Sequence, residues 1–362
     1  MKTYIARPDW YDDGFPNPLT ATGRSLGWGV VATGGIAHTV TRDLALLEDA
    51  TLQAVSSRSA ESARAFAEEF GVTRWYADDA GVSGYQALCA DPAVDVVYVA
   101  TPHGQHYEVA KAALEAGKHV LCEKALTLNA RQAEELVALA GERGLFLMEA
   151  MWARFVPGIQ RALEIIREGT IGQVQWVRAD LGFPAPVDPA SRIWAPEAGG
   201  GALLDLTVYP LLWAWGTLGA PESLHAVGGL TPWGVDTQNA ITLGYPGGAF
   251  AQLQSSLVSQ SPRVASVCGS LGFVETIDSV NNPSQIRVCA DWNGTDWGLD
   301  RIEEFEVYGS GYTYELREVT RCIQQGLTES PTMPWQDSVD IMRLFDGVRA
   351  QLGVSYPQDA RD

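Results

Sequence analysis

From Leu26 onward, short apolar runs alternate with longer segments whose apolar residues recur every three or four positions. The apolar runs are WGVVATGG (28–35), LQAVSS (52–57), VDVVYVATP (94–102), KHVLCEK (118–124) and LFLMEA (145–150). The amphipathic segments are IAHTVTRDLALLED (36–49), SAESARAFAEEFG (59–71), GQHYEVAKAALEAGK (104–118) and NARQAEELVALAGERG (129–144). Continuous apolar runs are typical of strands buried on both faces of a parallel sheet. The alternation therefore predicts βαβ units and a doubly wound parallel sheet.

Capping residues mark the ends of two of these predicted helices. Ser59 is expected to be an N-cap and Gly71 to follow the end of the same helix. Asn129 and Gln132 have the spacing of a capping box, and Gly144 is expected to stop that helix.

The second half of the chain has strand-like runs punctuated by turns, without helices between them. These runs cover residues 174–183, 222–230, 239–245, 249–257, 265–270 and 272–278. Two helical segments, 312–326 and 336–353, are expected to close the chain.

Length and composition limit the class of protein. A chain of 362 residues is too long for one ordinary core, so two domains are expected. The formal net charge of −19 disfavours nucleic acid as a partner. No apolar run reaches the roughly 18 residues of a membrane helix, and residues 1–26 lack the apolar stretch of a secretory signal. Five scattered cysteines favour reduced thiols, and together these features predict a cytoplasmic protein.

The loop after the first predicted strand, ATGGIA (32–37), lies where a dinucleotide-binding fold carries G-x-G-x-x-G/A. Gly34 and Ala37 fit the second and third positions, whereas Ala32 replaces the first glycine and is expected to fit only with a negative φ. A glycine turn without a ligand is the alternative. The expected cofactor-binding residues of this loop are Thr33, Gly34, Gly35 and Ile36.

The loop after the second predicted strand has no carboxylate, although an NAD site usually places one there to bind the ribose hydroxyls. Ser57 and Arg58 occupy it, and a guanidinium can neutralise a 2′-phosphate. NADP is therefore favoured and NAD remains possible. The alternative is that Arg58 is a solvated charge at the start of a helix.

The next two strand ends also carry polar residues. Thr101, Pro102 and His106 follow one strand and are expected to contact the cofactor. His103 and His106 make a poor metal site without cysteine or carboxylate ligands nearby, so loop hydrogen bonds are expected instead. Glu123 and Lys124 end the following strand and are also expected to contact the cofactor. A buried lysine there is costly unless it is paired or solvated in a cleft. A Lys–Glu surface pair is the alternative reading.

A carboxylate and a phenol share one face of an otherwise apolar helix. In GGGALLDLTVYP (199–210), Asp205 and Tyr209 are four residues apart. The three glycines before them are expected to leave room and free N–H groups at the helix start. The alternative is a helix-terminal charge beside a core aromatic residue.

Taken in order, ATGGIA, TPHGQHYEVAKAALEAGKHVLCEKALTLN, MEAMWARF and GGGALLDLTVYP resemble the Gfo/Idh/MocA oxidoreductase family. The chain is most similar to the branch of dimeric trans-dihydrodiol dehydrogenases and NADP-dependent D-xylose dehydrogenases. The resemblance covers roughly residues 27–330. It implies an α/β protein with a Rossmann domain (27–149) after an N-terminal extension (1–26). The second α/β domain (150–362) would be built on a large, open, mostly antiparallel sheet.

The resemblance also implies roles for single residues. Lys124 matches the lysine of the family's E-K-P motif, with Ala125 in place of proline, and Asp205 and Tyr209 match its D-x-x-x-Y/H motif. Tyr209 would be the general acid/base, assisted by Lys124, because a phenol with a pKa of about 10 needs help near neutral pH. Asp205 would orient a substrate hydroxyl or the lysine.

The substrate implied is a pyranose sugar of the D-xylose or glucose type, or a trans-dihydrodiol. Trp152, Arg154 and Phe155 are expected to face it, directly after the last Rossmann strand. A homodimer or homotetramer would form through the open sheet. Residues 1–26 are expected to be an arm or a disordered tail.

Overall fold

The computed structural model describes residues 4–11, 17–79 and 81–361, and these fold into two compact units. The parallel-sheet unit comprises Asp12–Trp152 and Tyr308–Met342. The mixed-sheet unit comprises Met1–Tyr11, Ala153–Val307 and Arg343–Asp362. Residues 308–342 thus belong to the parallel-sheet unit, although they follow the whole central part of the mixed-sheet unit in the chain.

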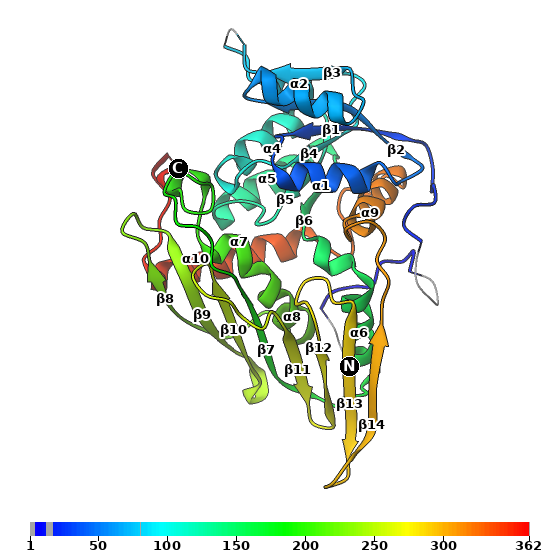
Figure 1. Ribbon diagram of the computed structural model, residues 1–362, viewed down its shortest axis with the longest axis vertical. Helices are drawn as coiled ribbons and strands as arrows, with labels where there is room; N and C mark the ends of the chain where they lie inside the picture. The colour runs from blue at the N-terminus through cyan, green and yellow to red at the C-terminus, as the bar shows by residue number, and fades with distance from the viewer. Residues whose placement is uncertain (1–3, 12–16, 80, 362) are drawn as a thin grey trace. The chain divides into compact units, whose positions relative to one another are not determined.

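Within the described residues, the parallel-sheet unit holds a six-stranded sheet in the order β3-β2-β1-β4-β5-β6, with every pair parallel (Figure 1). The strands are β1 (Leu26–Val31), β2 (Ala50–Ser57), β3 (Arg74–Ala77), β4 (Val96–Val99), β5 (His119–Glu123) and β6 (Leu147–Ala150). The helices are α1 (Gly35–Leu44), α2 (Ala60–Glu69), α3 (Gly84–Cys89), η1 (His103–Gln105), α4 (His106–Glu115), α5 (Ala130–Arg143) and α9 (Thr313–Gln324). The first residues of α10 (Trp335–Leu352) also belong here. This confirms the doubly wound parallel sheet that the alternating pattern predicted, and its strand order is that of the Rossmann domain that the resemblance implied.

The local signals of this unit are confirmed. The Ser59 side chain accepts a hydrogen bond from the Ser62 N–H, and Asn129 accepts one from the Gln132 N–H. Gly144 ends α5 with φ 62°. The strand β3 and the helix α3 were missed, because a four-residue strand at the sheet edge has too short a pattern to recognise.

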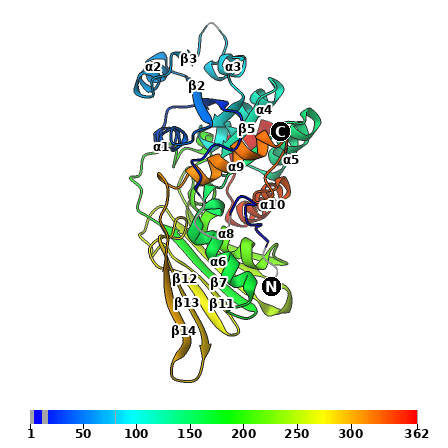
Figure 2. The same ribbon diagram turned by 90° about the vertical axis from the view of Figure 1, so that its right-hand side faces the viewer.

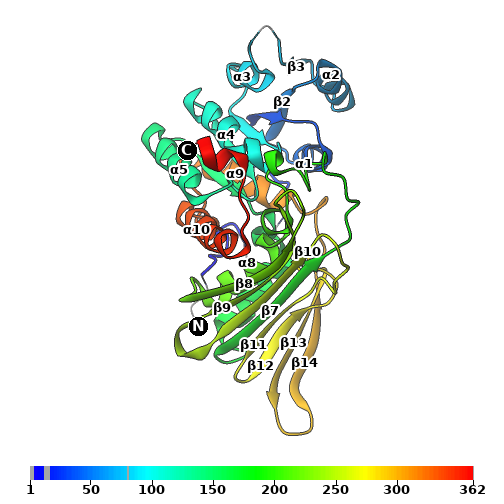
Figure 3. The same ribbon diagram turned by 90° about the vertical axis from the view of Figure 1, so that its left-hand side faces the viewer.

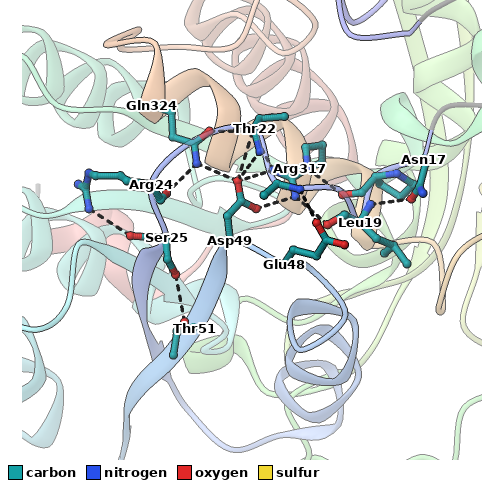
Figure 4. Close-up of polar contacts among 12 residues, drawn as sticks. Asn17, Leu19, Thr22, Arg24, Ser25, Glu48, Asp49, Thr51, Arg317 and Gln324 are labelled. Carbon is teal, nitrogen blue, oxygen red and sulfur yellow. Dashed lines mark hydrogen bonds and ion pairs between the residues drawn. The ribbon is translucent and has the colours of Figure 1, made fainter.

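Residues 17–25, within the part of the chain expected to be an arm or a tail, are fastened to this unit by a buried ion pair (Figure 4). Arg317 of α9 and Asp49 are 1% and 2% exposed, with Nη2 to Oδ1 at 2.7 Å and Nη1 to Oδ2 at 3.0 Å. The same guanidinium donates to the carbonyls of Pro18 and Leu19 and to the Thr22 hydroxyl. The hydrogen bonds that Asp49 accepts, first from Arg317 and then from Gln324 and the Thr22 N–H, lower its pKa to about 2 despite its burial.

The described part of the mixed-sheet unit is built on an eight-stranded sheet in the order β14-β13-β12-β11-β7-β10-β9-β8. Its strands are β7 (Val174–Gly182), β8 (Ser223–Leu230), β9 (Asp236–Gly244), β10 (Phe250–Ser256), β11 (Ala265–Gly269), β12 (Gly272–Thr276), β13 (Gln285–Trp292) and β14 (Trp297–Glu304). Its helices are α6 (Pro157–Glu168), η3 (Pro196–Ala198), α7 (Ala202–Leu206), α8 (Val208–Leu218), η4 (Pro246–Gly248) and η5 (Pro357–Arg361). All of η2 (Trp152–Phe155) except its first residue also belongs to this unit. Only β7 and β10 pair in parallel, so the sheet is mostly antiparallel, as expected.

Helices α6 and α8 cover one face of this sheet (Figure 2). On that face Val177, Ala179 and Leu253 are buried, whereas Arg178, Phe250 and Gln252 on the other face are exposed. Figure 3 shows this second face with no helix of the described residues in front of it. The strands β13 and β14 and the helix α6 were missed in the sequence. Among the described residues, every helix is too short or too polar to cross a bilayer.

We expect Arg317→Met to lower the free energy of unfolding of the parallel-sheet unit by about 3–5 kcal/mol, because it leaves the buried Asp49 carboxylate without its cation. The exposed Arg42–Glu69 pair is the matched control, and Arg42→Met should cost less than about 1 kcal/mol. Denaturant unfolding followed by circular dichroism measures both. Equal losses in the two variants would contradict the role given to the buried pair.

Candidate active site

The strand order places four loops side by side at one edge of the parallel sheet. All six strands in the described unit run the same way, so their carboxyl ends lie at the same edge. The order β2-β1-β4-β5 therefore brings together the loops that begin after Val31, Ser57, Val99 and Glu123. The order reverses between β1 and β4, which is where ligands bind in doubly wound sheets.

The turn after β1 corrects one expectation. Ala32 was expected to keep a negative φ, but its φ is 86°. The backbone thus makes the same tight turn that a glycine would make, and an L-residue adopts this region at a cost of about 1–2 kcal/mol. The Ala32 N–H donates to the Ser56 carbonyl, which ties the turn to the end of β2.

The start of α1 fits the pyrophosphate of a dinucleotide. Gly34 is its N-cap, and no side chain caps the first N–H groups. A Cβ added at Gly34 or Gly35 would meet nothing within 4 Å, so the backbone is open to a ligand. Thr33 and Ile36, beside them, are half-buried. Uncapped N–H groups at a helix start favour a bound anion.

The loops after β2 and β4 also have polar groups available for a nucleotide. Ser57 is half-buried and Arg58 is exposed, and the described residues form no ion pair with Arg58. Thr101 and Pro102 are half-buried. The buried Oγ1 of Thr101 has no hydrogen-bond partner among the described residues, which leaves a polar atom for a ligand.

Glu123 and Lys124 lie at the end of β5, where Glu123 is 6% exposed and Lys124 is half-buried. The Tyr98 hydroxyl donates to Glu123 at 2.7 Å. The peptide bond between Lys124 and Ala125 is cis. The two histidines after β4 hold this loop, because a ring nitrogen of each lies within 3.1 Å of a loop carbonyl. Loop hydrogen bonding by the histidines is therefore confirmed, and no group of three metal-ligating side chains occurs in the described part of the chain.

Asp205 and Tyr209 lie on two short helices that meet at Thr207. Pro210 has no N–H for the Leu206 carbonyl, which breaks the hydrogen-bond ladder, yet Thr207 keeps helical angles of φ −68° and ψ −19°. The face shared by Asp205 and Tyr209 is thus preserved across the break. Both side chains are nearly buried, at 9% and 8% exposed. The Arg192 Nη1 lies 3.4 Å from the Asp205 Oδ1.

The glycine run before α7 does not supply free N–H groups, contrary to expectation. The N–H groups of Gly199, Gly200 and Gly201 donate to the carbonyls of Pro196, Ala195 and Ile193. The glycines are needed for close packing instead. A Cβ at Gly200 would lie 2.6 Å from the Ile193 carbonyl oxygen, and Gly201, with φ 115°, packs against the Asp236 carboxylate.

Asp236, which the sequence analysis missed, holds the start of α7. Its Oδ2 accepts hydrogen bonds from the Leu203 N–H at 2.9 Å and the Asn239 amide at 3.0 Å. Asn239 in turn contacts Thr207, between Asp205 and Tyr209 in the chain. Asp236 is fully buried, and burial raises its pKa to about 6. A lone acid at the start of an apolar strand was the only sequence signal.

The three aromatic and basic residues expected to face the substrate differ in their surroundings. Trp152 is 5% exposed, and its ring lies 4.5 Å from that of Tyr312, which the sequence analysis did not single out. Arg154 and Phe155 are 1% and 0% exposed. Neither of the latter two side chains presents surface to a substrate in this structure.

Comparison with known proteins gives the family. A sequence model of an oxidoreductase family with an NAD-binding Rossmann fold, GFO/IDH/MocA, matches residues 26–151, and that of the GFO/IDH/MocA C-terminal domain matches residues 159–275. The trans-1,2-dihydrobenzene-1,2-diol dehydrogenase of Mus musculus is 36% identical over 93% of this chain and 100% of its own length. The chain belongs to the GFO/IDH/MocA oxidoreductase family. The enzyme is therefore an oxidoreductase of CH–OH groups that uses a nicotinamide cofactor.

Other relatives agree in sequence and in structure. The human trans-1,2-dihydrobenzene-1,2-diol dehydrogenase is 33% identical over 93% of this chain and 100% of its own. The structure of the aldose–aldose oxidoreductase of Caulobacter crescentus, solved with glycerol, matches with a TM-score of 0.80 at 26% identity. The match covers 91% of this chain and 97% of that enzyme's chain. The 3-ketoreductase KijD10 of Actinomadura kijaniata, solved with NADP and TDP-benzene, has a TM-score of 0.78 at 29% identity, covering 91% and 98%.

We expect Ala32→Gly to stabilise the enzyme by about 0.5–1 kcal/mol, since relief of the positive φ outweighs the extra backbone entropy of glycine in the unfolded chain. Ala112→Gly, in the interior of α4, should instead destabilise it by about 1 kcal/mol. Unfolding midpoints in denaturant measure both. A loss of stability at position 32 would show that the turn is not strained.

We expect Asp236 to make stability depend on pH between about 4 and 6. Its folded-state pKa of about 6 lies above the unfolded value of about 3.9, so the folded state binds the proton more tightly. Its contribution to the free energy of unfolding therefore falls as pH rises through this window and stays reduced above it. Asp236→Asn should remove this dependence and raise stability at pH 7.5 by up to roughly 3 kcal/mol. Unfolding of both proteins from pH 4 to 7.5 tests this, and a difference constant with pH would refute it.

Proposed function

We propose that the enzyme is an NADP-dependent dehydrogenase of a pyranose sugar of the D-xylose or glucose type, or of a trans-dihydrodiol. The observation that carries the proposal is the name shared by relatives that are 33–36% identical over more than nine tenths of the chain. Both substrate classes have hydroxyl groups on adjacent ring carbons. A carboxylate and a phenol one helical turn apart, Asp205 and Tyr209, suit two such hydroxyls.

In this proposal the substrate loses a hydride from one carbon and a proton from the hydroxyl oxygen on that carbon. A nicotinamide held at the start of α1 and the neighbouring loops would supply the hydride acceptor. Tyr209 takes the hydroxyl proton as general base and returns it as general acid in the reverse direction. The Lys124 ammonium favours the phenolate and polarises the same oxygen, and Asp205 accepts a hydrogen bond from the neighbouring hydroxyl. Trp152 supplies an apolar surface for the C–H face of the ring.

The choice of NADP rests on the loop after β2. Ser57 and Arg58 stand where an NAD enzyme usually has a carboxylate, and the Arg58 side chain is exposed. A carboxylate would repel a 2′-phosphate, whereas a guanidinium binds it through two parallel hydrogen bonds. NAD is the alternative cofactor.

A second candidate is an aldose–aldose oxidoreductase that keeps NADP bound between two half-reactions. The likeness to the Caulobacter crescentus enzyme favours it. Protein purified without added cofactor would then show nicotinamide absorbance. A non-catalytic NADP sensor would bind the cofactor and turn over no substrate.

We further propose a homodimer through the uncovered face of the mixed sheet, with a homotetramer as the alternative. Trp176 and Phe250 stack on this face with ring planes 11° apart, and Val227 is 70% exposed. Exposed apolar side chains on one open sheet face are typical of a protein interface. The mass of the purified protein in sedimentation equilibrium tests the dimer.

The first experiment is nicotinamide reduction by the purified enzyme with NADP or NAD and a panel of aldoses, inositols and trans-diols. We expect turnover with NADP and a pyranose or a trans-diol. In the same assay Tyr209→Phe should lower kcat at least a thousandfold, because the proton acceptor is lost, while NADPH binding changes little. A variant that kept near-normal turnover would overturn the proton-transfer role of Tyr209.

We expect Arg58→Ala to weaken NADP binding about tenfold or more, because a charge-assisted hydrogen bond to the 2′-phosphate is lost, and to change NAD binding less than twofold. Arg64→Ala, the loss of an exposed arginine of α2, the helix that follows the Arg58 loop, is the matched control. Fluorescence titration with NADPH and NADH measures both. Equal losses for the two cofactors would exclude the 2′-phosphate role.

A further inference from the structure

Two histidines that follow β4 face the consecutive main-chain carbonyl groups of Lys124 and Ala125. The Nε2 of His103 lies 3.1 Å from the Lys124 oxygen. The Nδ1 of His106 lies 2.9 Å from the Ala125 oxygen, and its Nε2 lies 2.9 Å from the Thr101 oxygen. The two rings are neighbours, with centroids 5.3 Å apart. They connect the loop that carries Lys124 to the end of the adjacent strand.

The His106 ring is enclosed by protein. It is 1% exposed, and both ring nitrogens face main-chain carbonyls, so no nitrogen of this ring is directed at a nucleotide. Burial lowers its pKa to about 4, which makes the ring neutral at physiological pH. A neutral imidazole has one N–H and donates to only one carbonyl at a time.

We infer that His106, with His103, positions Lys124 for proton transfer. This differs from the sequence-based expectation that His106 binds the cofactor. The inference rests on the proposed function, in which Lys124 acts on the substrate oxygen. The two histidine contacts restrain the main chain of the loop at Ala125, which replaces the proline of the family motif. Misplacement of a catalytic group by about 1 Å can lower a rate about a hundredfold. Loss of the restraint on the Lys124 main chain is therefore expected to lower kcat.

A double-mutant cycle tests this with the full-length enzyme, NADP and the panel substrate of highest turnover. His106→Asn should lower kcat 10–100-fold and change the NADPH dissociation constant less than threefold. Lys124→Met should lower kcat at least as much. Adding His106→Asn to Lys124→Met should lower kcat less than twofold further, because His106 acts through the lysine that is already absent.

His119→Asn is the matched control. His119 is a half-buried histidine whose ring accepts a hydrogen bond from the Phe146 N–H at 2.9 Å. It begins β5, whereas Lys124 follows the other end of this strand, so its loss leaves the Lys124 loop unchanged. Its loss should leave kcat within threefold of the wild-type value. If His106→Asn does not fold, His103→Asn takes its place in the cycle with the same expectation, because His103 contacts the Lys124 carbonyl directly.

The outcomes separate this inference from the proposed function. A Lys124→Met variant with full turnover would refute the catalytic role of Lys124 and with it the proposed mechanism. If Lys124→Met is inactive but His106→Asn lowers kcat equally with and without Lys124, the histidine is only structural and the inference fails. A raised NADPH dissociation constant with unchanged kcat would make His106 a cofactor-binding residue and would also overturn the inference.

Discussion

Parallel pairing on both sides of β1 is the constraint on which the cofactor-binding part of the enzyme depends. Parallel strands must be joined by crossovers, so each helix returns the chain to begin the next strand at the same edge. The loops after β1, β2, β4 and β5 therefore meet, although Thr33 and Lys124 are far apart in the chain. Every residue of β1 is buried, which makes this strand the centre of the unit. The uncapped start of α1, Arg58, Thr101 and Lys124 occupy that edge as a consequence.

The buried acids show how strongly a neighbouring cation decides whether a carboxyl group is ionised. Asp49 faces Arg317 and its pKa falls to about 2. Asp236 forms no ion pair with a cation of the described residues, and burial raises its pKa to about 6. Glu315 of α9 is the extreme case in the described residues: it is fully buried, and neither oxygen has a hydrogen-bond partner. Burial and the nearby Glu123 and Asp43 raise its pKa well above the ordinary value, which favours the protonated acid. A paired acid fastens two segments together, and an unpaired one costs stability at neutral pH.

Glycine and proline positions show where local reasoning reached its limit. Ala32 takes a glycine-like φ because the Ala32 N–H is tied to β2, and the surrounding sheet outweighs the preference of an L-residue. The glycines before α7 are dictated by the Ile193 carbonyl and the Asp236 carboxylate, which lie close in space but not in the sequence motif. The Lys124 loop is held by two histidines from the neighbouring strand end. In each case a contact between distant segments decided the local conformation.

Periodicity and caps were enough to predict the parallel sheet, most of its helices and the strand-rich second half, because these signals are local and repeat along the chain. The amino-acid sequence by itself also determined the chemistry available: glycines at a strand end, an arginine where a carboxylate is usual, a lysine and a carboxylate–phenol pair. Only the tertiary structure decided which strand-end loops are neighbours, that His106 contacts main-chain carbonyls, that Phe155 is core and that Asp236 holds α7. These features depend on pairing and burial between segments far apart in the chain, and no local pattern encodes which segments meet.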